Sequence, residues 1–238
     1  MCKACDAVAV QRRQFLLGGA ALVAATSTLA SQTWAAGGPT THVKPDEALE
    51  KLKAGNAKYV AAPQVCAADL AKQREGVAKA QMPWATIISC ADSRVPPELL
   101  FGGVGPGELF VARNAGNMVD TATMGTVEYG AAVLGVPLIV VLGNERCGAV
   151  AAACDVVSKK AKFPGSIGPM VQAIVPAAQA VNGKPGDFVD NAIRESAKRT
   201  AAQVGTKSKI IADLVKGGKV KIMAGRYDLD DGKVEFFA

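Results

Sequence analysis

Two short apolar runs stand out along the chain, and small or polar residues follow each of them directly. The first covers residues 84–90 and the second covers residues 138–142. Runs of this length that are rich in Ile and Val are typical of parallel strands buried on both faces. Ligands of open α/β sheets collect at the carboxyl ends of such strands. We therefore expect the polar residues that follow the two runs to form a site.

The rest of the chain alternates between helical spacing and further strand-like runs. Helices are predicted over 45–61, 67–79, 121–135, 149–157, 169–181, 187–204 and 207–216. Strands are predicted over 108–113 and 220–225, and a turn at 230–233 leads into a last strand, 234–237. Strands that alternate with helices predict an α/β fold, with a mainly parallel sheet flanked by helices and with N-terminal helices before it.

The first 36 residues have the layout of a secretory leader. Arg12 and Arg13 precede an apolar stretch over 15–29, and small residues follow near Ala35. The arginine pair makes this segment resemble a twin-arginine signal. A membrane anchor is the alternative, but the apolar stretch is short and interrupted by Gly, Ser and Thr, which favours cleavage.

This interpretation divides the chain into three parts. We expect a signal peptide over 1–36, a linker over 37–44 and one domain over 45–238. The mature protein is then expected in the periplasm, without a membrane attachment once the leader is removed.

Composition limits the classes of function that the domain can have. Hydrophobic residues make up 50% of the chain and charged residues 20%, which is typical of a globular domain rather than a disordered one. The net charge of +6 comes from scattered Lys and Arg, and only 5% of residues are aromatic. Because basic residues do not form a stripe and few rings could stack on bases, we expect no nucleic-acid partner.

Four cysteines lie outside the leader, and two chemistries compete for them. They are Cys66, Cys90, Cys147 and Cys154. An even number of cysteines in an exported protein is compatible with two disulfides. A protein that resembles twin-arginine passengers, however, crosses the membrane already folded. A thiolate–metal site could therefore form in the reducing cytoplasm before export, and both interpretations stay open.

Spacing offers one metal hypothesis. Cys90 and Asp92 lie two residues apart and share a face if the strand continues to Asp92. Cys147 lies three residues beyond Asn144, and the two share a face if a helix starts there. Two thiolates with one or two oxygen or nitrogen donors suit tetrahedral zinc. We therefore expect Cys90, Asp92 and Cys147 to meet at one zinc ion, although spacing alone favours ordinary buried cysteines.

Several motifs, in the right order, resemble the beta-class carbonic anhydrases. The segment Cys90-Ala91-Asp92-Ser93-Arg94 resembles their first zinc motif. Residues 108–117 look like their second signature, and residues 128–131 through 147–149 are similar to their third. The end of the chain, with Tyr-Asp-Leu at 227–229 and Gly-Lys-Val at 232–234, matches their usual end. The resemblance covers essentially all of residues 45–237.

The resemblance implies an enzyme that interconverts carbon dioxide and bicarbonate at a zinc ion. The family holds zinc with two cysteines and a histidine, and an aspartate or water takes the fourth place. Carried over by position, Cys90 and Cys147 are the thiolate ligands, Asp92 is the exchangeable carboxylate and Arg94 is its ion-pair partner. When the arginine holds the aspartate away, the fourth place opens to water.

The resemblance also implies a substrate pocket and an assembly. Gln81 matches an amide on the substrate side, and Tyr129 matches an aromatic residue of the pocket. An ordinary role at a strand edge or on a helix is the alternative for both residues. Members of the family usually form dimers or tetramers with pockets near the subunit interface, so we expect a homodimer or a homotetramer.

One position departs from the family pattern. Asn144 stands where the family has its zinc histidine, and the only histidine of the chain, His42, is remote in sequence. An amide oxygen is a weaker zinc donor than imidazole. Zinc could be completed by Asn144 or water, or it could recruit another ligand such as Glu145.

The departure leaves alternative functions open. The metal could be absent, with a disulfide between Cys90 and Cys147, in an impaired or inactive member of the fold that acts as a binding or scaffold protein. Hydrolysis of a carbon dioxide analogue, such as carbonyl sulfide or carbon disulfide, is a further alternative, because relatives of the family carry it out.

Overall fold

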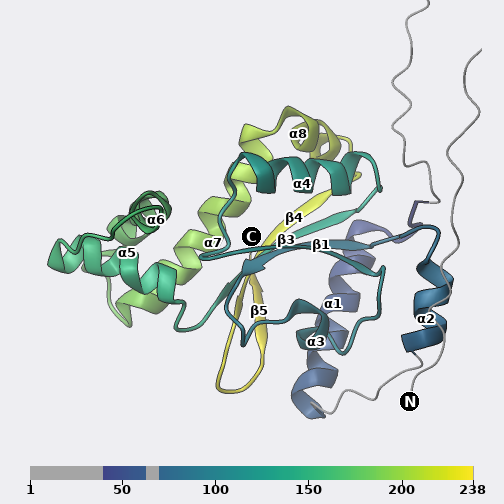
Figure 1. Cartoon of the computed structure of the whole chain (residues 1–238), viewed down its shortest axis with the longest axis horizontal. Coiled ribbons are helices and arrows are strands. Elements are labelled where there is room, and N and C mark those ends of the chain that lie inside the picture. Colours follow the sequence, from purple (N-terminus) through teal and green to yellow (C-terminus); the bar gives the residue numbers. More distant parts are fainter. Residues whose placement is uncertain (1–39, 63–69, 238) are drawn as a thin grey trace, which may run out of the picture. The chain divides into compact units, whose positions relative to one another are not determined.

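The computed structural model describes residues 40–62 and 70–237, and these form a five-stranded sheet with helices on both faces (Figure 1). The predicted leader, residues 37–39 of the predicted linker and Cys66 lie outside the described residues. The strand order is β2-β1-β3-β4-β5. The strands are β1 (Ala85–Cys90), β2 (Leu109–Asn114), β3 (Leu138–Asn144), β4 (Lys221–Tyr227) and β5 (Val234–Phe237). Four of them are parallel and β5 is antiparallel to β4, which confirms the prediction of a mainly parallel sheet.

The two apolar runs of the sequence are the neighbouring strands β1 and β3, and every residue in both strands is buried. Alternate side chains enter the cores on opposite faces of the sheet, with Ile87 in one core and Ile88 in the other. The prediction of strands buried on both faces is confirmed. Strand β3 extends two residues beyond its apolar run, because Gly143 and Asn144 pair with β4.

Eight helices surround the sheet in the described part of the chain. They are α1 (Pro45–Ala61), α2 (Leu70–Val77), α3 (Pro97–Leu100), α4 (Thr121–Ala132), α5 (Gly148–Lys159), α6 (Ile167–Val181), α7 (Phe188–Lys207) and α8 (Lys209–Lys216). The seven predicted helices are present with ends shifted by a few residues, and the first residues of the predicted helix 67–79 lie outside the described part. The short helix α3 was not predicted.

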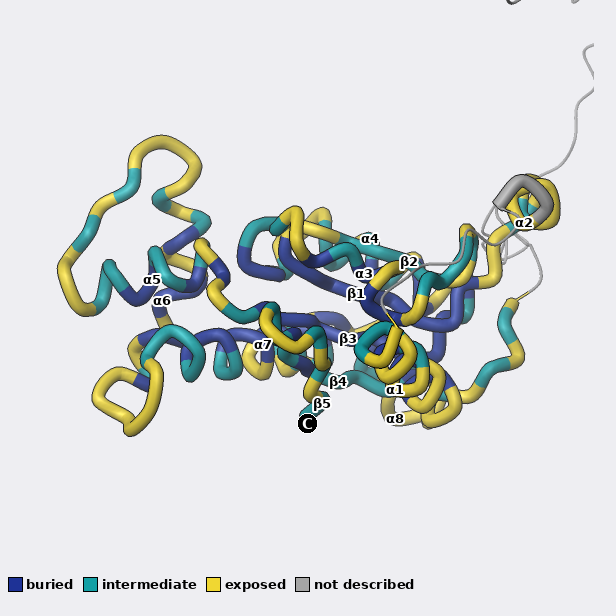
Figure 2. Tube along the Cα trace, turned by 90° about the horizontal axis from the view of Figure 1, so that it is seen from below, coloured by how far each residue is buried: buried dark blue, intermediate teal, exposed yellow. Residues whose placement is uncertain are grey.

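The helices divide between the two faces of the sheet. Helices α1 and α3 pack on one face, and α4, α7 and α8 pack on the other (Figure 1). In Figure 2 the buried residues follow the strands, while the outer helix faces are exposed. Helices α5 and α6 lie beyond the carboxyl ends of the strands and form a third apolar cluster that contains Cys90 and Cys147. The fold therefore buries the two cysteines beneath helices α5 and α6.

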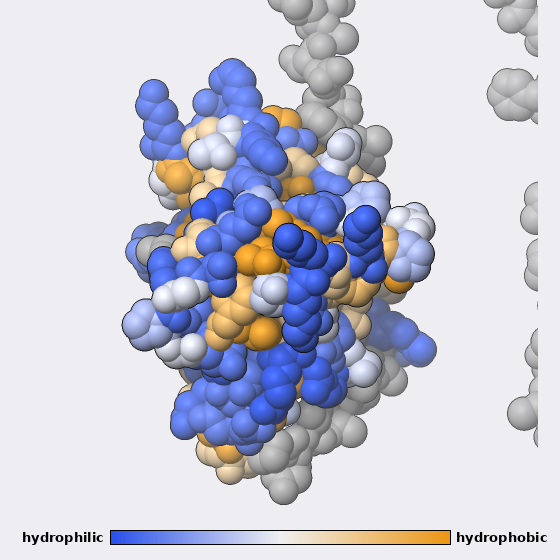
Figure 3. Space-filling view, turned by 90° about the vertical axis from the view of Figure 1, so that its left-hand side faces the viewer, coloured by the Kyte–Doolittle hydropathy of each residue, from blue (hydrophilic) through white to orange (hydrophobic). Residues whose placement is uncertain are grey.

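The surface at the α5–α6 side carries apolar residues in its centre and hydrophilic residues around them (Figure 3). Ile167, at the start of α6, is 49% exposed. An apolar centre with a polar rim is typical of protein contact surfaces. Within residues 40–62 and 70–237, no helix combines the length and the apolar character that crossing a membrane requires.

Candidate functional site

The structure brings Cys90 and Cys147 together at the carboxyl edge of the sheet. Cys90 ends β1, and Cys147 immediately precedes α5 in the connection that leaves β3. Strands β1 and β3 are parallel neighbours, so their carboxyl ends meet at one edge although the two cysteines are 57 positions apart. Their sulfur atoms are 3.8 Å apart, and both residues are buried.

The distance between the sulfurs distinguishes the two cysteine chemistries. Two thiolates on one tetrahedral zinc, each about 2.3 Å from the metal, lie about 3.8 Å from each other. A disulfide would bring the sulfurs to about 2.05 Å. None of the three cysteines in the described part of the chain is in a disulfide. The pair therefore has the spacing of two ligands that share a cation, or of two thiols that share a proton, and not that of a disulfide.

The sulfurs also perturb each other electrostatically. A hydrogen bond between the two side chains lowers the pKa of the Cys90 thiol, and the backbone N–H of Gly116 supports this by donating to Cys90 Sγ at 3.4 Å. The same shared hydrogen bond, together with burial, raises the pKa of Cys147. The pair therefore favours a thiolate on Cys90 and a protonated thiol on Cys147. A thiolate is the form of cysteine that binds metals.

Asp92 and Arg94 form an ion pair next to the cysteines. Arg94 Nε and Nη2 donate to the two Asp92 carboxylate oxygens at 2.9 and 2.7 Å, and the backbone N–H of Arg94 donates to Oδ1 at 3.0 Å. These bonds from Arg94 lower the pKa of Asp92 to about 2. Asp92 is therefore ionised at neutral pH and has a defined orientation.

Asn144, the last residue of β3, contacts Asp92 next to this ion pair. Its Nδ2 donates to Asp92 Oδ2 at 3.4 Å and to the backbone carbonyl of Glu145 at 3.1 Å. The residue is fully buried, and its Oδ1 has no hydrogen-bond partner within the described part of the chain. A buried acceptor without a donor costs about 1–3 kcal/mol. Two buried thiols and an orphan amide oxygen are donors that a divalent cation would satisfy, so these residues fit zinc. The Asp92 carboxylate is held by Arg94 through both of its oxygens and does not form a close group with the two sulfurs.

Three other residues considered for the site lie away from the sulfurs. His42 is exposed and precedes α1. Glu145 turns its carboxylate to the backbone N–H of Leu229 at 3.0 Å, and Arg226 lies 3.6 Å from it. It forms a close acidic group with Asp228 and Asp230 rather than with the sulfurs, so the geometry does not support Glu145 as a ligand beside Cys90 and Cys147. Gln81 is exposed and precedes β1, at the opposite end of that strand from Cys90.

Tyr129 is also distant from the sulfurs within a single chain. It lies on α4, is 38% exposed, and stacks on Phe110 with ring centres 6.2 Å apart. Phe110 pairs with Thr86 near the amino end of β1, whereas Cys90 ends that strand. One chain therefore does not bring Gln81 or Tyr129 to the sulfurs.

The sequence analysis did not predict the hydrogen bonds that Arg113 donates to the segment carrying Cys90 and Asp92. Arg113 Nε donates to the Cys90 carbonyl at 3.0 Å, and its Nη2 donates to the Asp92 carbonyl at 2.6 Å. The available signals were that Arg113 and Gly116 lie at the end of a predicted strand and within the second family signature over 108–117. That strand proves to be β2, the neighbour of β1, so its end borders the site.

The fold and the site define an α/β protein with a thiol- and carboxylate-lined centre at the carboxyl edge of a parallel sheet. The sequence model of the family described as "Carbonic anhydrase" matches residues 85–234. The chain is 35% identical over 192 residues to "Carbonic anhydrase 2" of Mycobacterium tuberculosis. The aligned region covers 81% of this chain and 92% of the relative. It is 36% identical over 191 residues to "Carbonic anhydrase" of Mycolicibacterium smegmatis, covering 80% and 92%. The chain belongs to the carbonic anhydrase family.

Solved structures agree with the beta class. A Coccomyxa beta-carbonic anhydrase in complex with acetazolamide matches with a TM-score of 0.62 and 29% identity, over 69% of this chain and 76% of that chain. A tetrameric beta-carbonic anhydrase of Sordaria macrospora shares the fold, with a TM-score of 0.62 and 23% identity over 71% and 89% of the two chains. The resemblance to the beta class is confirmed. Beta-carbonic anhydrases are zinc enzymes, and membership supports hydration of carbon dioxide as the reaction.

Proposed function

We propose that this protein is a carbonate dehydratase, which reversibly hydrates carbon dioxide to bicarbonate and a proton, and that Cys90, Asp92 and Cys147 hold its zinc ion. Asn144 occupies the position of the family histidine and offers its amide oxygen. The observation that carries the proposal is the pair of buried sulfurs 3.8 Å apart at the carboxyl edge of the sheet.

The side chains around the metal position prepare the chemistry. Zinc, when bound, supplies the Lewis acidity that lowers the pKa of water towards neutrality. Arg94 keeps Asp92 ionised and oriented through two charge-assisted hydrogen bonds. Burial of both sulfurs keeps bulk water away from the thiolates. His42, the only histidine, is exposed before α1, so the proton leaves through buffer or a carboxylate rather than through an imidazole at the site.

Metal analysis combined with a rate measurement tests the proposal. We expect the purified protein to contain about one zinc ion per chain, since the donor set forms one site. We also expect a pH-indicator stopped-flow assay to show carbon dioxide hydration above the buffer rate. A strong chelator should remove the metal and the rate together, and added zinc should restore both. Protein without zinc and without a rate above buffer would contradict the proposal.

A second candidate function follows from Asn144. A member of the family that lacks the imidazole ligand could serve as a binding or scaffold protein on the same fold. Its signature is the absence of activity as purified, with activity appearing when the imidazole is restored. The same stopped-flow assay separates the two candidates.

We further propose that the chain assembles into a homodimer or a homotetramer. The positions of Gln81 and Tyr129, far from the sulfurs of their own chain, support a pocket completed by a second copy. The apolar centre of the surface in Figure 3 and the tetrameric Sordaria relative also support assembly. Light scattering of the purified protein should give a mass of two or four chains, and a monomeric mass would contradict this.

For location, we propose export to the periplasm through the twin-arginine-like leader over residues 1–36, which leaves the domain over 45–238 behind a short linker. The arginine pair and the apolar stretch of the leader support this. Mass spectrometry of protein from the periplasmic fraction of a bacterial host should find a mature chain that begins near residue 37. Full-length protein confined to the cytoplasm would contradict export.

A further inference from the structure

The connection between Asn144 and Cys147 contains a residue in an unusual backbone conformation. Arg146 has a φ of 52°, in the left-handed region that residues other than Gly, Asn and Asp rarely adopt. Such conformations persist only where surrounding contacts determine them, and they cluster at functional sites. The two ends of this short connection are proposed zinc-site residues, so the contacts that hold Arg146 bear directly on the site.

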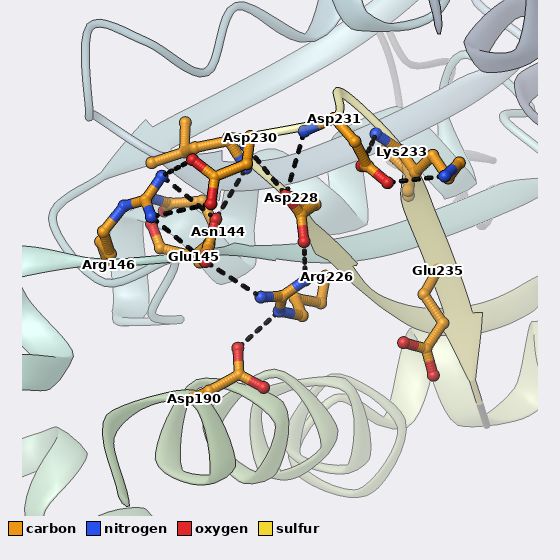
Figure 4. A network of polar contacts seen from close by, with 12 residues as sticks. Asn144, Glu145, Arg146, Asp190, Arg226, Asp228, Asp230, Asp231, Lys233 and Glu235 are labelled. Carbon is orange, nitrogen blue, oxygen red and sulfur yellow. Dashed lines mark hydrogen bonds and ion pairs between the residues drawn. The ribbon is translucent and has the colours of Figure 1, made fainter. Parts of the chain in front are cut away.

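The side chain of Arg146 reaches across to the turn between β4 and β5 (Figure 4). Its Nη2 lies 2.6 Å from Asp230 Oδ1, and its Nη1 lies 3.1 Å from Asp230 Oδ2. This is the two-pronged arrangement that gives an arginine–carboxylate pair its directional specificity. Glu145 adds a contact on the other side, with Oε2 at 3.3 Å from Arg146 Nη2.

The turn that carries Asp230 is itself anchored to the body of the fold. Asp228 Oδ1 accepts the backbone N–H groups of Asp230 and Asp231, at 2.8 and 3.2 Å. Asp228 Oδ2 accepts from Arg226 Nη1 at 2.8 Å, and Arg226 Nε donates to Asp190 on α7 at 2.5 Å. Figure 4 shows this continuous path from α7 to Arg146. A fixed turn can therefore hold the arginine, and the arginine can hold the connection.

We propose that Arg146 and Asp230 are positioning residues for the metal centre: their ion pair holds the connection in the conformation that places Cys147 against Cys90. The proposal rests on the zinc site of the proposed function. Neither residue touches the metal position. Both side chains are largely exposed, at 52% and 71%, and exposed ion pairs contribute little to global stability. The expected consequence is a loss of zinc affinity without a matching loss of stability.

Asp230→Asn and Asp231→Asn form a matched pair of variants. Both remove one carboxylate charge from the same turn, but the Asp231 side chain pairs with Lys233 and, within the described residues, does not bond to the connection. An exposed ion pair changes an equilibrium by at most about fivefold. In a competition titration against a chromophoric chelator, we therefore expect Asp230→Asn to lower zinc affinity by about three- to fivefold. Asp231→Asn should leave the affinity at the wild-type value.

A second measurement needs no metal. Hydrogen exchange of the zinc-free protein should be faster in peptides that cover residues 143–151 of Asp230→Asn, and unchanged in Asp231→Asn. The midpoint of denaturant unfolding should stay the same in both variants. The double variant Arg146→Ala with Asp230→Asn should lose no more zinc affinity than Arg146→Ala alone, because both changes break one contact.

The outcomes separate this proposal from the proposed function. If the wild type binds no zinc, the proposed function fails, and exchange in the zinc-free variants still decides whether the ion pair orders the connection. If Asp230→Asn has the same hydrogen exchange over residues 143–151 and the same zinc affinity as the wild type, the positioning role is overturned. An equal loss in Asp231→Asn would also overturn it, because the effect would then belong to the charge of the turn rather than to its bond with Arg146.

Discussion

Asn144→His is expected to raise the zinc affinity of the purified protein about a hundredfold and to raise its rate of carbon dioxide hydration. Four-ligand structural zinc sites have apparent binding free energies of about 10–16 kcal/mol, so one good ligand contributes about 3 kcal/mol, which is about a hundredfold in affinity. An amide oxygen is a weak zinc donor, whereas neutral imidazole is among the commonest. The substitution therefore replaces the weakest donor of the set.

The surroundings of Asn144 are suited to a histidine. The present amide donates to the Glu145 carbonyl at 3.1 Å, and a histidine Nδ1–H can donate to the same carbonyl. Such a bond fixes the tautomer and leaves Nε2 as the metal donor. Asn144 Oδ1, which has no hydrogen-bond partner within residues 40–62 and 70–237, would be removed by the same change. The variant gains a ligand and loses an unsatisfied buried acceptor.

Asn144→Ala is the companion variant for this test. If the amide oxygen contributes to metal binding, Asn144→Ala should bind zinc more weakly than the wild type, and Asn144→His should bind it more tightly. Competition titration gives the affinities and stopped-flow hydration gives the rates. Unchanged zinc content and rate in Asn144→His would show that the missing imidazole is not the deficit. Activity that appears only in Asn144→His would favour the scaffold function for the wild type.

Local sequence patterns were sufficient for the strands and helices but not for the meeting of the two cysteines. Strands β1 and β3 were predictable because burial on both faces requires continuous apolar runs. The sequence does not state that β1 and β3 are neighbours, and this order is what brings Cys90 to Cys147. Residue spacing and the family resemblance both predicted that Cys90 and Cys147 lie together. The strand order explains how they meet.

The Arg146–Asp230 ion pair and the backbone conformation of Arg146 could not be predicted either, because they depend on contacts between distant parts of the chain. Arg146 and Asp230 are 84 positions apart, and no local pattern links an arginine after one strand to a turn after another. The positive φ of Arg146 has no signal in the sequence, because glycine is the residue that usually marks such a conformation. Gln81 and Tyr129 were assigned to the pocket by resemblance, and within one chain both lie away from the sulfurs.

Cys147→Ala should weaken zinc binding strongly and reduce hydration to the buffer rate. Removing one thiolate takes away about 3 kcal/mol or more of binding free energy by the same reasoning, so affinity should fall at least about a hundredfold. Without the metal no group of the site can bring the pKa of water near neutrality, so hydration should fall to the buffer rate. Cys147 is fully buried, and alanine is smaller but apolar, so the fold should tolerate the change better than it would tolerate serine.

Cys154→Ala controls for the loss of a buried sulfur. Cys154 lies seven positions further along the chain, in α5, and is also buried in the α5–α6 cluster. Burial raises the pKa of its thiol to about 11, so it stays protonated and unsuited to metal binding at neutral pH. Both variants lose similar packing, so their unfolding midpoints in the presence of a chelator should be similar. Added zinc should raise the midpoint of Cys154→Ala, because a ligand that binds only the folded state stabilises it, and should leave that of Cys147→Ala unchanged. Full zinc binding in Cys147→Ala would place the metal elsewhere and remove the basis of the proposed site.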